Sequence, residues 1–183
     1  VELVSVTHST LQPAITVIHT PKGALVYTLD FKLDNNPPFG KTTNMPRLRE
    51  LGKEKVIALF PDCTRADEEG HTFSEKVARH MLKDVVLGLN DKKHAIIATT
   101  FASNINRLHS LVDMGELIGR EVVFVGRSFG RWLGAAEDLG LANFVKRARV
   151  LTNGRQYSQF LKEANVKRGK YFMVMTGNQG EPN

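Results

Sequence analysis

The first sixty residues alternate between short apolar runs and turn-forming residues, which is typical of β-strands. Three runs rich in β-branched and aromatic residues, VELVSV, ITVIHT and ALVYTLDF, open the chain. Pro21-Lys22-Gly23 separates the second run from the third and predicts a hairpin turn. After a loop at residues 35–40, the pattern predicts a short helix over Met45–Leu51 and a strand over Lys55–Phe60. We therefore expect a sheet of antiparallel character in this part of the chain.

From residue 72 onward the pattern changes to alternating helices and strands. Thr72 and Glu75 have the spacing of a capping box, and the apolar stripe behind them predicts a helix over residues 72–88. Further strands are predicted at His94–Thr99, Glu121–Val125 and Tyr171–Thr176, and further helices from near Ser103, over Phe129–Lys146 and over Tyr157–Ala164. Repeated strand and helix units favour a mainly parallel sheet with helices on both faces, so the expected fold class is α/β.

The composition is that of a globular protein, with 42% hydrophobic and 24% charged residues among 183. No apolar run approaches the roughly 20 residues that span a bilayer. The single cysteine, Cys63, excludes an internal disulfide and a Cys-rich zinc site, and it suits a reducing compartment such as the cytoplasm. The net charge of +6 is compatible with a polyanionic partner such as RNA.

An acidic, turn-prone stretch at residues 67–70 separates the hairpin-rich part from the strand-helix part. We place a domain boundary there, with one domain over 1–66, a second over 67–176, and a return to the first domain over 177–183. Residues 1–66 are too few for the antiparallel part to close a core of its own. The chain does not begin with Met and no element is predicted after QGEPN, so both ends read as cuts through a longer protein.

Three polar residues stand at the ends of apolar runs in the first part: His8 in VTHST, Asp30 in YTLDFK and Asp62 in LFPDCT. Side chains at strand ends gather at the rim of a sheet, where imidazole and carboxylate groups can converge on one metal ion. No H-x-H-x-D-H sequence accompanies them, so they form part of a metal site at most. The plainer interpretation makes His8 a hydrogen-bonded structural residue and the two aspartates turn or cap residues.

In the second part, three predicted strands end in polar loops at residues 99–104, 126–132 and 176–182. Ligands of parallel sheets bind beyond the carboxyl ends of the strands, where helix N-termini offer free amides to anions. The candidate phosphate and RNA contacts in these loops are Ser103, Asn104, Arg127, Ser128, Gln179 and Glu181. The alternatives are that Ser103 and Ser128 are plain N-caps and that Phe101, Phe129 and Trp132 belong to the core. Cys63 is expected to be a small buried residue rather than a nucleophile.

The order of these segments resembles a known family. VIHTPKGALVYTLDFK, FPDCTRAD with GHTFSE, IIATTFASNINRL, GREVVFVGRSFGRW and MTGNQGEP follow one another as in metallo-β-lactamase nucleases with a β-CASP insertion, and most closely the ribonuclease J family. The resemblance implies an αββα metallo-β-lactamase lobe, a β-CASP lobe and two zinc ions. It also implies cleavage of RNA, as a 5′-to-3′ exonuclease that prefers a 5′ monophosphate and sometimes as an endonuclease. RNA is the expected partner, and a homodimer of the complete protein is left open.

The resemblance also assigns roles to residues. His8 would be a zinc ligand, Asp30 the carboxylate that bridges both ions, and Asp62 the first β-CASP motif residue, which supports catalysis. Leu29 stands where the family usually has Gly, and Cys63 where it usually has Ser. The H-x-H-x-D-H cluster would lie before Val1 and an H-x-S-G-H segment after Asn183, so this stretch alone is expected to be inactive.

Two other functions compete with this interpretation. One is a catalytically silent RNA-binding or assembly module, in which basic charge carries binding that weakens with salt. The other is an unrelated nucleotide-binding α/β domain in which the GRSFGR loop cradles a phosphate, although that loop matches neither G-x-G-x-x-G nor the Walker pattern.

Overall fold

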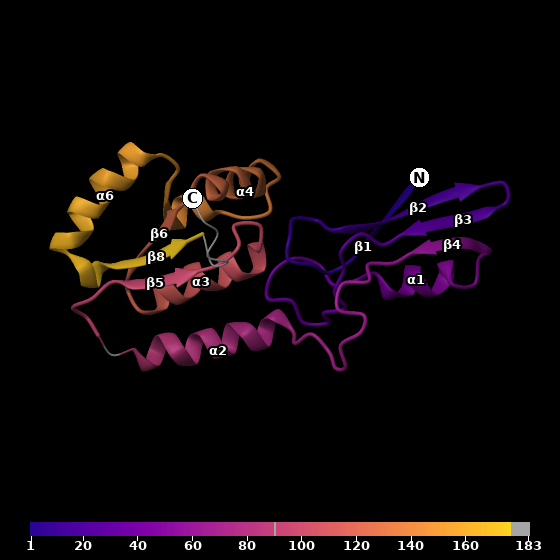
Figure 1. Cartoon of the computed structure of the whole chain (residues 1–183), viewed down its shortest axis with the longest axis horizontal. Coiled ribbons are helices and arrows are strands. Elements are labelled where there is room, and N and C mark those ends of the chain that lie inside the picture. The colour runs from indigo at the N-terminus through magenta and orange to yellow at the C-terminus, as the bar shows by residue number, and fades with distance from the viewer. Residues whose placement is uncertain (90, 177–183) are drawn as a thin grey trace. The chain divides into compact units, whose positions relative to one another are not determined.

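A computed structural model describes residues 1–89 and 91–176 of the chain. The chain divides into two compact units, Val1–Val77 and Ala78–Asn183, which we call the first and second units (Figure 1). The division expected from the sequence, into 1–66, 67–176 and 177–183, stays a prediction. None of the helices in the described ranges is both long and apolar enough to cross a lipid bilayer.

The first unit is built on a four-stranded sheet. Its elements are β1 (Glu2–Ser5), β2 (Ala14–Thr20), β3 (Gly23–Tyr27), α1 (Met45–Leu51) and β4 (Val56–Phe60), and the strand order is β1-β2-β3-β4. β1, β2 and β3 pair antiparallel, whereas β4 pairs parallel to β3. The predicted hairpin is confirmed, because Thr20 pairs with Gly23 across the turn. Gly23 has a φ of 140°, and a side chain there would overlap the carbonyl oxygen of Lys55 (2.5 Å).

One face of this sheet carries the core of the first unit. Alternate residues along the strands, among them Val4, Val17 and Val26, are buried, and Leu51 of α1 joins their cluster. The residues between them point the other way, so Leu3 and Tyr27 are 69% and 52% exposed. The period-2 pattern of the sequence therefore places one apolar set under α1 and leaves a second apolar set open.

The second unit contains a parallel sheet flanked by helices (Figure 1). Its elements are α2 (Glu75–Gly88, which begins at the end of the first unit), β5 (Ile96–Thr99), α3 (Ile105–Leu117), β6 (Glu121–Val125), α4 (Arg127–Asp138), α5 (Phe144–Arg147), β7 (Ala148–Leu151), α6 (Gly154–Val166), the 3₁₀ turn η1 (Arg168–Lys170) and β8 (Tyr171–Met175). The strands are ordered β5-β8-β6-β7, and all three pairings are parallel. The expected α/β fold class is confirmed.

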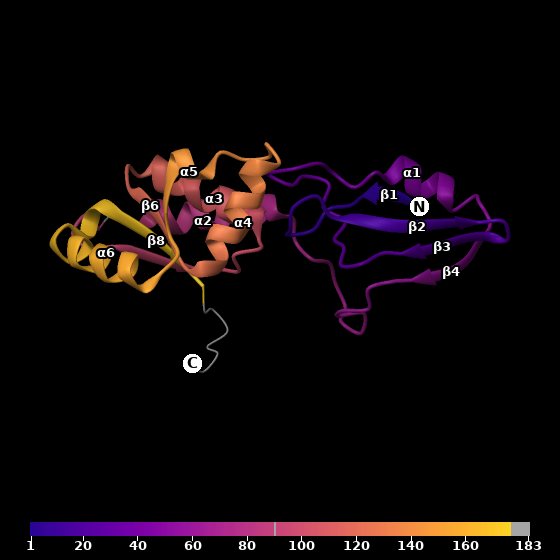
Figure 2. The same ribbon diagram turned by 90° about the horizontal axis from the view of Figure 1, so that it is seen from above.

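Helices cover both faces of this sheet (Figure 2). Val123 and Met173 lie in one cluster with Phe160 and Ala164 of α6. Their neighbours in sequence, Val122 and Phe172, point to the opposite face, where both approach Gly115 of α3. Strands buried on both faces explain why β6 and β8 read as continuous apolar runs.

One sequence prediction in this unit is wrong, and one strand was missed. The helix expected over Phe129–Lys146 is broken into α4 and α5, because Gly140 takes a φ of 65° and ends α4. Strand β7 was not predicted, because its four residues include the charged Arg149 and follow Lys146 and Arg147. Arg149 of β7 lies over the Phe160 ring and bonds Glu163 at 2.9 Å, so a charged residue fits at this position of the sheet.

The capping box predicted at Thr72 is also wrong, because α2 begins at Glu75. The backbone N–H of Glu75 donates to Asp34 Oδ2 at 2.8 Å, and the N–H of Lys76 donates to Ser74 Oγ at 3.1 Å. The carboxylate that accepts a hydrogen bond from the first residue of α2 thus belongs to a loop 41 residues earlier in the chain. The spacing of residues near the helix start cannot predict such a partner.

Candidate functional site

His8 and Asp30 lie on two segments that are joined by a single β-bridge between Thr7 and Lys32. The Lys32 N–H donates to the Thr7 carbonyl at 2.8 Å, and the Thr7 hydroxyl donates to the Lys32 carbonyl. Thr7 is buried, and its N–H donates to Thr43 Oγ1 at 3.0 Å. This buried threonine therefore fixes the two candidate ligand segments side by side.

Asp62 is fixed from the same end of the sheet by a second buried threonine, Thr28. The Asp62 N–H donates to Thr28 Oγ1 at 2.9 Å, and the Thr28 N–H donates to the carbonyl of Phe60 at 3.0 Å. Hydrogen bonds from Thr64, aided by the nearby charge of His8, lower the pKa of the Asp62 carboxyl below its usual value. Asp62 thus lies within electrostatic range of His8 and favours its ionised form.

Leu29 stands between Thr28 and Asp30 with a φ of 54°. This is the left-handed region, where a Cβ atom is strained and glycine is favoured. Leu29 is 45% exposed, so its side chain is only partly buried and packing offsets the strain only in part. The residue that stands where the resemblance expects glycine therefore keeps a backbone conformation suited to glycine.

The donors present do not fit a zinc centre on their own. In residues 1–89 and 91–176, no group of three or more His, Cys, Asp or Glu side chains is placed to hold a metal ion. His8 Nδ1 lies 3.3 Å from the hydroxyl of Ser9, and Asp30 is exposed. Two candidate ligands are fewer than the three protein ligands of a catalytic zinc site.

In the second unit, the carboxyl ends of β5, β8 and β6 lie at one edge of the sheet because all their pairings are parallel. Asn104 lies at this edge and caps α3, with its side chain accepting the Arg107 N–H at 3.1 Å. The prediction that Ser103 caps this helix is therefore wrong by one residue. Ser103 and Asn104 are both partly exposed at this edge.

Ser128 does not cap α4 either, because the helix begins at Arg127 and its N-cap is Gly126. Gly126 has a φ of 155°, and a Cβ there would lie 3.1 Å from Thr176 Oγ1. The Gly126 backbone therefore approaches the end of β8 closely. Arg127 and Ser128 beside it are exposed. Gln179 and Glu181 lie outside the described residues.

The predicted burial of three aromatic residues and of the single cysteine is confirmed for one residue only. Phe129 is fully buried, as a core residue should be, whereas Phe101 is 49% exposed and Trp132 is partly exposed. The prediction that Cys63 is buried is wrong: the thiol is exposed and donates only a 3.5 Å contact to the Pro61 carbonyl.

Sequence reasoning missed the residues that hold the first unit's rim together, namely Thr7, Thr28 and Asp34. Asp34 is buried; burial raises its pKa, but hydrogen bonds from Ser74 and from the backbone of Asn36 and Glu75 outweigh this, so the pKa is lowered overall. The Asp-Asn-Asn sequence signals a local turn at this position, and the 2.9 Å bond from the Asn36 N–H confirms it. Nothing in the sequence signals the bond to Glu75.

The amino-acid sequence is similar to known proteins in both units. Residues 93–183 match the family model of the β-CASP domain of ribonuclease J. The second unit is thus of the β-CASP class, an α/β domain with a parallel sheet. Over 182 residues, the chain is 45% identical to the ribonuclease J of Pyrococcus abyssi, covering 100% of this chain and 40% of that protein. The chain belongs to the ribonuclease J family.

Two further relatives that are similar to the whole chain are also named ribonuclease J. The chain is 38% identical to the ribonuclease J of Methanocaldococcus jannaschii, covering 98% of this chain and 40% of the relative. It is 36% identical to that of Sinorhizobium meliloti, covering 100% of this chain and 30% of the relative. The chain thus spans less than half the length of these curated relatives.

Proposed function

We propose that this chain is the central part of a zinc-dependent ribonuclease that hydrolyses RNA phosphodiester bonds in RNA processing and decay. The observation that carries the proposal is the similarity along the whole chain, at 45% identity over 182 residues, to a protein named ribonuclease J. The expected mode is 5′-to-3′ exonuclease action on single-stranded RNA with a 5′ monophosphate, with internal cleavage as a further mode, in the cytoplasm.

In this proposal His8 and Asp30 are metal ligands that other residues of the complete protein join. The Thr7–Lys32 bridge supports the assignment, because it holds their two segments together. Asp62 has a positioning role, since Thr28 and Thr64 fix it while His8 lies within electrostatic range. Because the donors described here do not complete a metal site, no reaction step is assigned to them.

RNA contact is proposed for the second unit, at the carboxyl edge of its sheet. Asn104, Arg127 and Ser128 lie at the starts of two helices there, where backbone N–H groups favour phosphate oxygens. Ser103, Gln179 and Glu181 complete the proposed set. Arginine at this edge can bind a phosphate through two parallel hydrogen bonds.

A second candidate function is an RNA-binding module without catalysis of its own. It is favoured by the lack of any cluster of three metal-binding side chains in the described parts of the chain. Binding would then rest on charge alone and would not depend on zinc.

The deciding experiment is to read the gene through both ends of this stretch and to express the whole product. Loss of 5′-phosphorylated RNA in the presence of zinc, abolished by Asp30→Asn, is the result expected of the nuclease. RNA binding without any turnover, unchanged by a zinc chelator, would favour the silent module instead.

A further inference from the structure

Two basic segments of the second unit lie side by side at the amino ends of β5 and β8. A Cβ atom on Gly169 would overlap the carbonyl oxygen of Lys92 and would lie 3.4 Å from the Lys93 nitrogen. The backbone of η1 is therefore packed directly against the Lys92–Lys93 peptide, and only glycine fits at the contact. This packing joins Lys92 and Lys93 to Lys167 and Arg168 in one surface.

A buried arginine holds the two segments in place. The guanidinium of Arg120, which is only 9% exposed, donates to the carbonyl oxygens of His94 at 2.7 Å and of Tyr171 at 3.3 Å. It also donates to the carbonyl oxygen of Asp91. A charged group buried against three carbonyls fixes the lysine turn to the start of β8.

The positive charge of this surface is not neutralised locally. Lys92, Lys93 and Lys167 are exposed, and none of them forms an ion pair within the described part of the chain. The one acidic residue of the turn, Asp91, uses its carboxylate to accept the Lys93 N–H at 2.7 Å and to bond the His94 ring. The lysine ammonium groups are thus available to an anionic partner.

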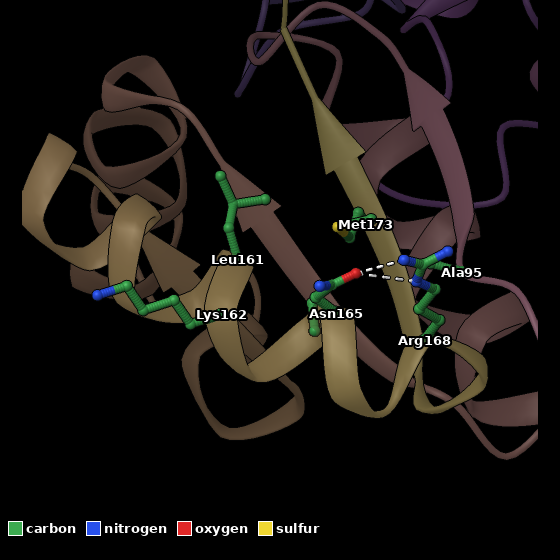
Figure 3. A pocket seen from close by; sticks show the side chains of 7 residues that line it. Ala95, Leu161, Lys162, Asn165, Arg168 and Met173 are labelled. Carbon is green, nitrogen blue, oxygen red and sulfur yellow. Dashed lines mark hydrogen bonds between the residues drawn. The ribbon is translucent and has the colours of Figure 1, made fainter.

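A shallow hollow of about 410 Å³ lies next to these segments in sequence, because its lining includes Ala95, two residues after Lys93, and Arg168, which follows Lys167 (Figure 3). Its apolar lining comes from Ala95, Leu161, Ala164 and Met173. Arg168 reaches over it, held by Asn165 through an Nε to Oδ1 bond of 3.2 Å (Figure 3). An apolar floor beside an oriented guanidinium suits a flat ring with a polar edge.

We propose that this surface binds single-stranded RNA, with backbone phosphates on Lys92, Lys93 and Lys167 and one unstacked base in the hollow beside Arg168. It lies at the amino edge of the sheet, whereas the contacts proposed above lie at the carboxyl edge. The inference rests on the proposed function, in which RNA is the substrate. It adds a second RNA contact, at the opposite edge of the sheet from the first. A hollow for a single base favours an unpaired strand over a duplex, whose bases stay stacked.

The test compares two triple variants of the whole chain that remove equal charge. Lys92→Gln/Lys93→Gln/Lys167→Gln alters the proposed surface, while Lys22→Gln/Lys41→Gln/Lys53→Gln alters three exposed lysines of the first unit. The probe is a fluorescent single-stranded oligouridylate of about 12 nucleotides, followed by anisotropy from about 50 to about 200 mM KCl.

We expect the surface variant to bind about tenfold more weakly and its slope of log K against log salt to become less negative by about 2, because each phosphate contact of a single strand contributes about 0.7. The control variant should stay within about twofold of the parent chain. If both variants bind RNA equally weakly, the loss of affinity comes from net charge alone and the proposal is overturned. The proposal is also overturned if the surface variant binds as tightly as the parent chain.

A variant without charge change gives an independent check. Gly169→Ala should displace the lysine turn and weaken binding several-fold, whereas Gly154→Ala, at a position with open space around it, should not. Normal binding by Gly169→Ala with a retained Trp132 fluorescence signal would contradict the placement of the turn. If the parent chain itself binds no RNA, both this surface and RNA contact by this chain are refuted. If the parent binds RNA and the surface variants bind it as tightly as the parent does, the surface alone is refuted and the proposed nuclease function stands.

Discussion

The two units differ in where they place charge. Residues 1–77 carry nine Lys and Arg against ten Asp and Glu, whereas residues 78–183 carry sixteen against nine. Both units contain ion pairs. In the first unit, Glu2 receives hydrogen bonds from Arg47, which together with His19 lower the pKa of its carboxyl to about 2. The excess of positive charge in the whole chain therefore belongs to the second unit.

The two units also differ in their cores. The first unit buries a small aliphatic cluster on one face of its sheet and leaves Leu3 and Tyr27 of the other face exposed. The second unit covers both faces and fully buries large side chains such as Phe124, Phe129 and Phe172. The second unit therefore combines the larger side chains in its core with the excess of basic residues, whereas the first unit has a smaller core and a nearly balanced charge.

The largest expected effect is in the core of the second unit. Phe172→Ala should destabilise that unit by about 3–5 kcal/mol, because it removes a fully buried ring that packs between β8 and α3. Trp132 is the single tryptophan and lies in α4, so its fluorescence during urea unfolding reports on this unit. Val17→Ala, in the first unit, is the matched change and should leave the Trp132 midpoint in place. A shift with both variants would show that the chain unfolds as one cooperative body.

A smaller effect is expected from a glycine of α3. A Cβ on Gly115 would overlap Val122 of β6 and lie 3.2 Å from the Phe172 ring, so Gly115→Ala should cost about 1–3 kcal/mol through overpacking. Gly134→Ala, in α4 with open space around it, should instead stabilise by about 0.5–1 kcal/mol, because alanine favours helix. Urea midpoints from Trp132 fluorescence measure both variants. Stabilisation by both would mean that α3 lies farther from the sheet than described.

The ion-pair cluster that joins α2, α3 and α5 should contribute about 1–2 kcal/mol. Asp113 bonds Arg147 at 2.5 Å and Arg79 at 2.6 Å. Burial raises the pKa of Asp113, but these two hydrogen bonds outweigh burial and lower the pKa below its ordinary value of 3.8. Since the folded pKa is the lower one, this stabilisation is complete above about pH 4 and is lost as the pH falls through the lowered pKa.

Asp113→Asn should therefore destabilise the second unit at pH 7 and lose less stability than the parent on acidification below about pH 4. Thermal unfolding at a series of pH values, followed by Trp132 fluorescence, measures the difference. Glu68→Gln removes an exposed pair with Arg65 and serves as the control, with an expected change within about 0.5 kcal/mol. Parallel pH profiles for the parent and Asp113→Asn would exclude this carboxylate as the source of acid sensitivity.

The sequence predicted the regular parts of both units and missed the features that depend on distant partners. The hairpin at Gly23, helix α1 and the parallel sheet follow from local period and turn chemistry, so their predictions were confirmed. The start of α2 depends on Asp34, 41 residues earlier in the chain, and was predicted wrongly. The candidate ligands were visible as polar residues at strand ends, but the buried threonines that fix them were not, because Thr7 and Thr28 resemble ordinary strand residues.

The smallest expected effect tests the rim of the first unit at Leu29. Leu29→Gly should stabilise that unit by up to about 1 kcal/mol, because relief of left-handed strain of about 1–2 kcal/mol exceeds the added freedom of glycine in the unfolded chain. Leu33→Gly is the matched control, since Leu33 is also an exposed leucine but has no positive φ, and it should lose about 0.5–1 kcal/mol. Hydrogen exchange of the β3 and β4 amides measures both changes within the first unit. Greater protection in Leu29→Gly alone would show that leucine strains the segment beside Asp30, whereas a loss of protection in both variants would mean that the Leu29 side chain contributes packing which outweighs its backbone strain.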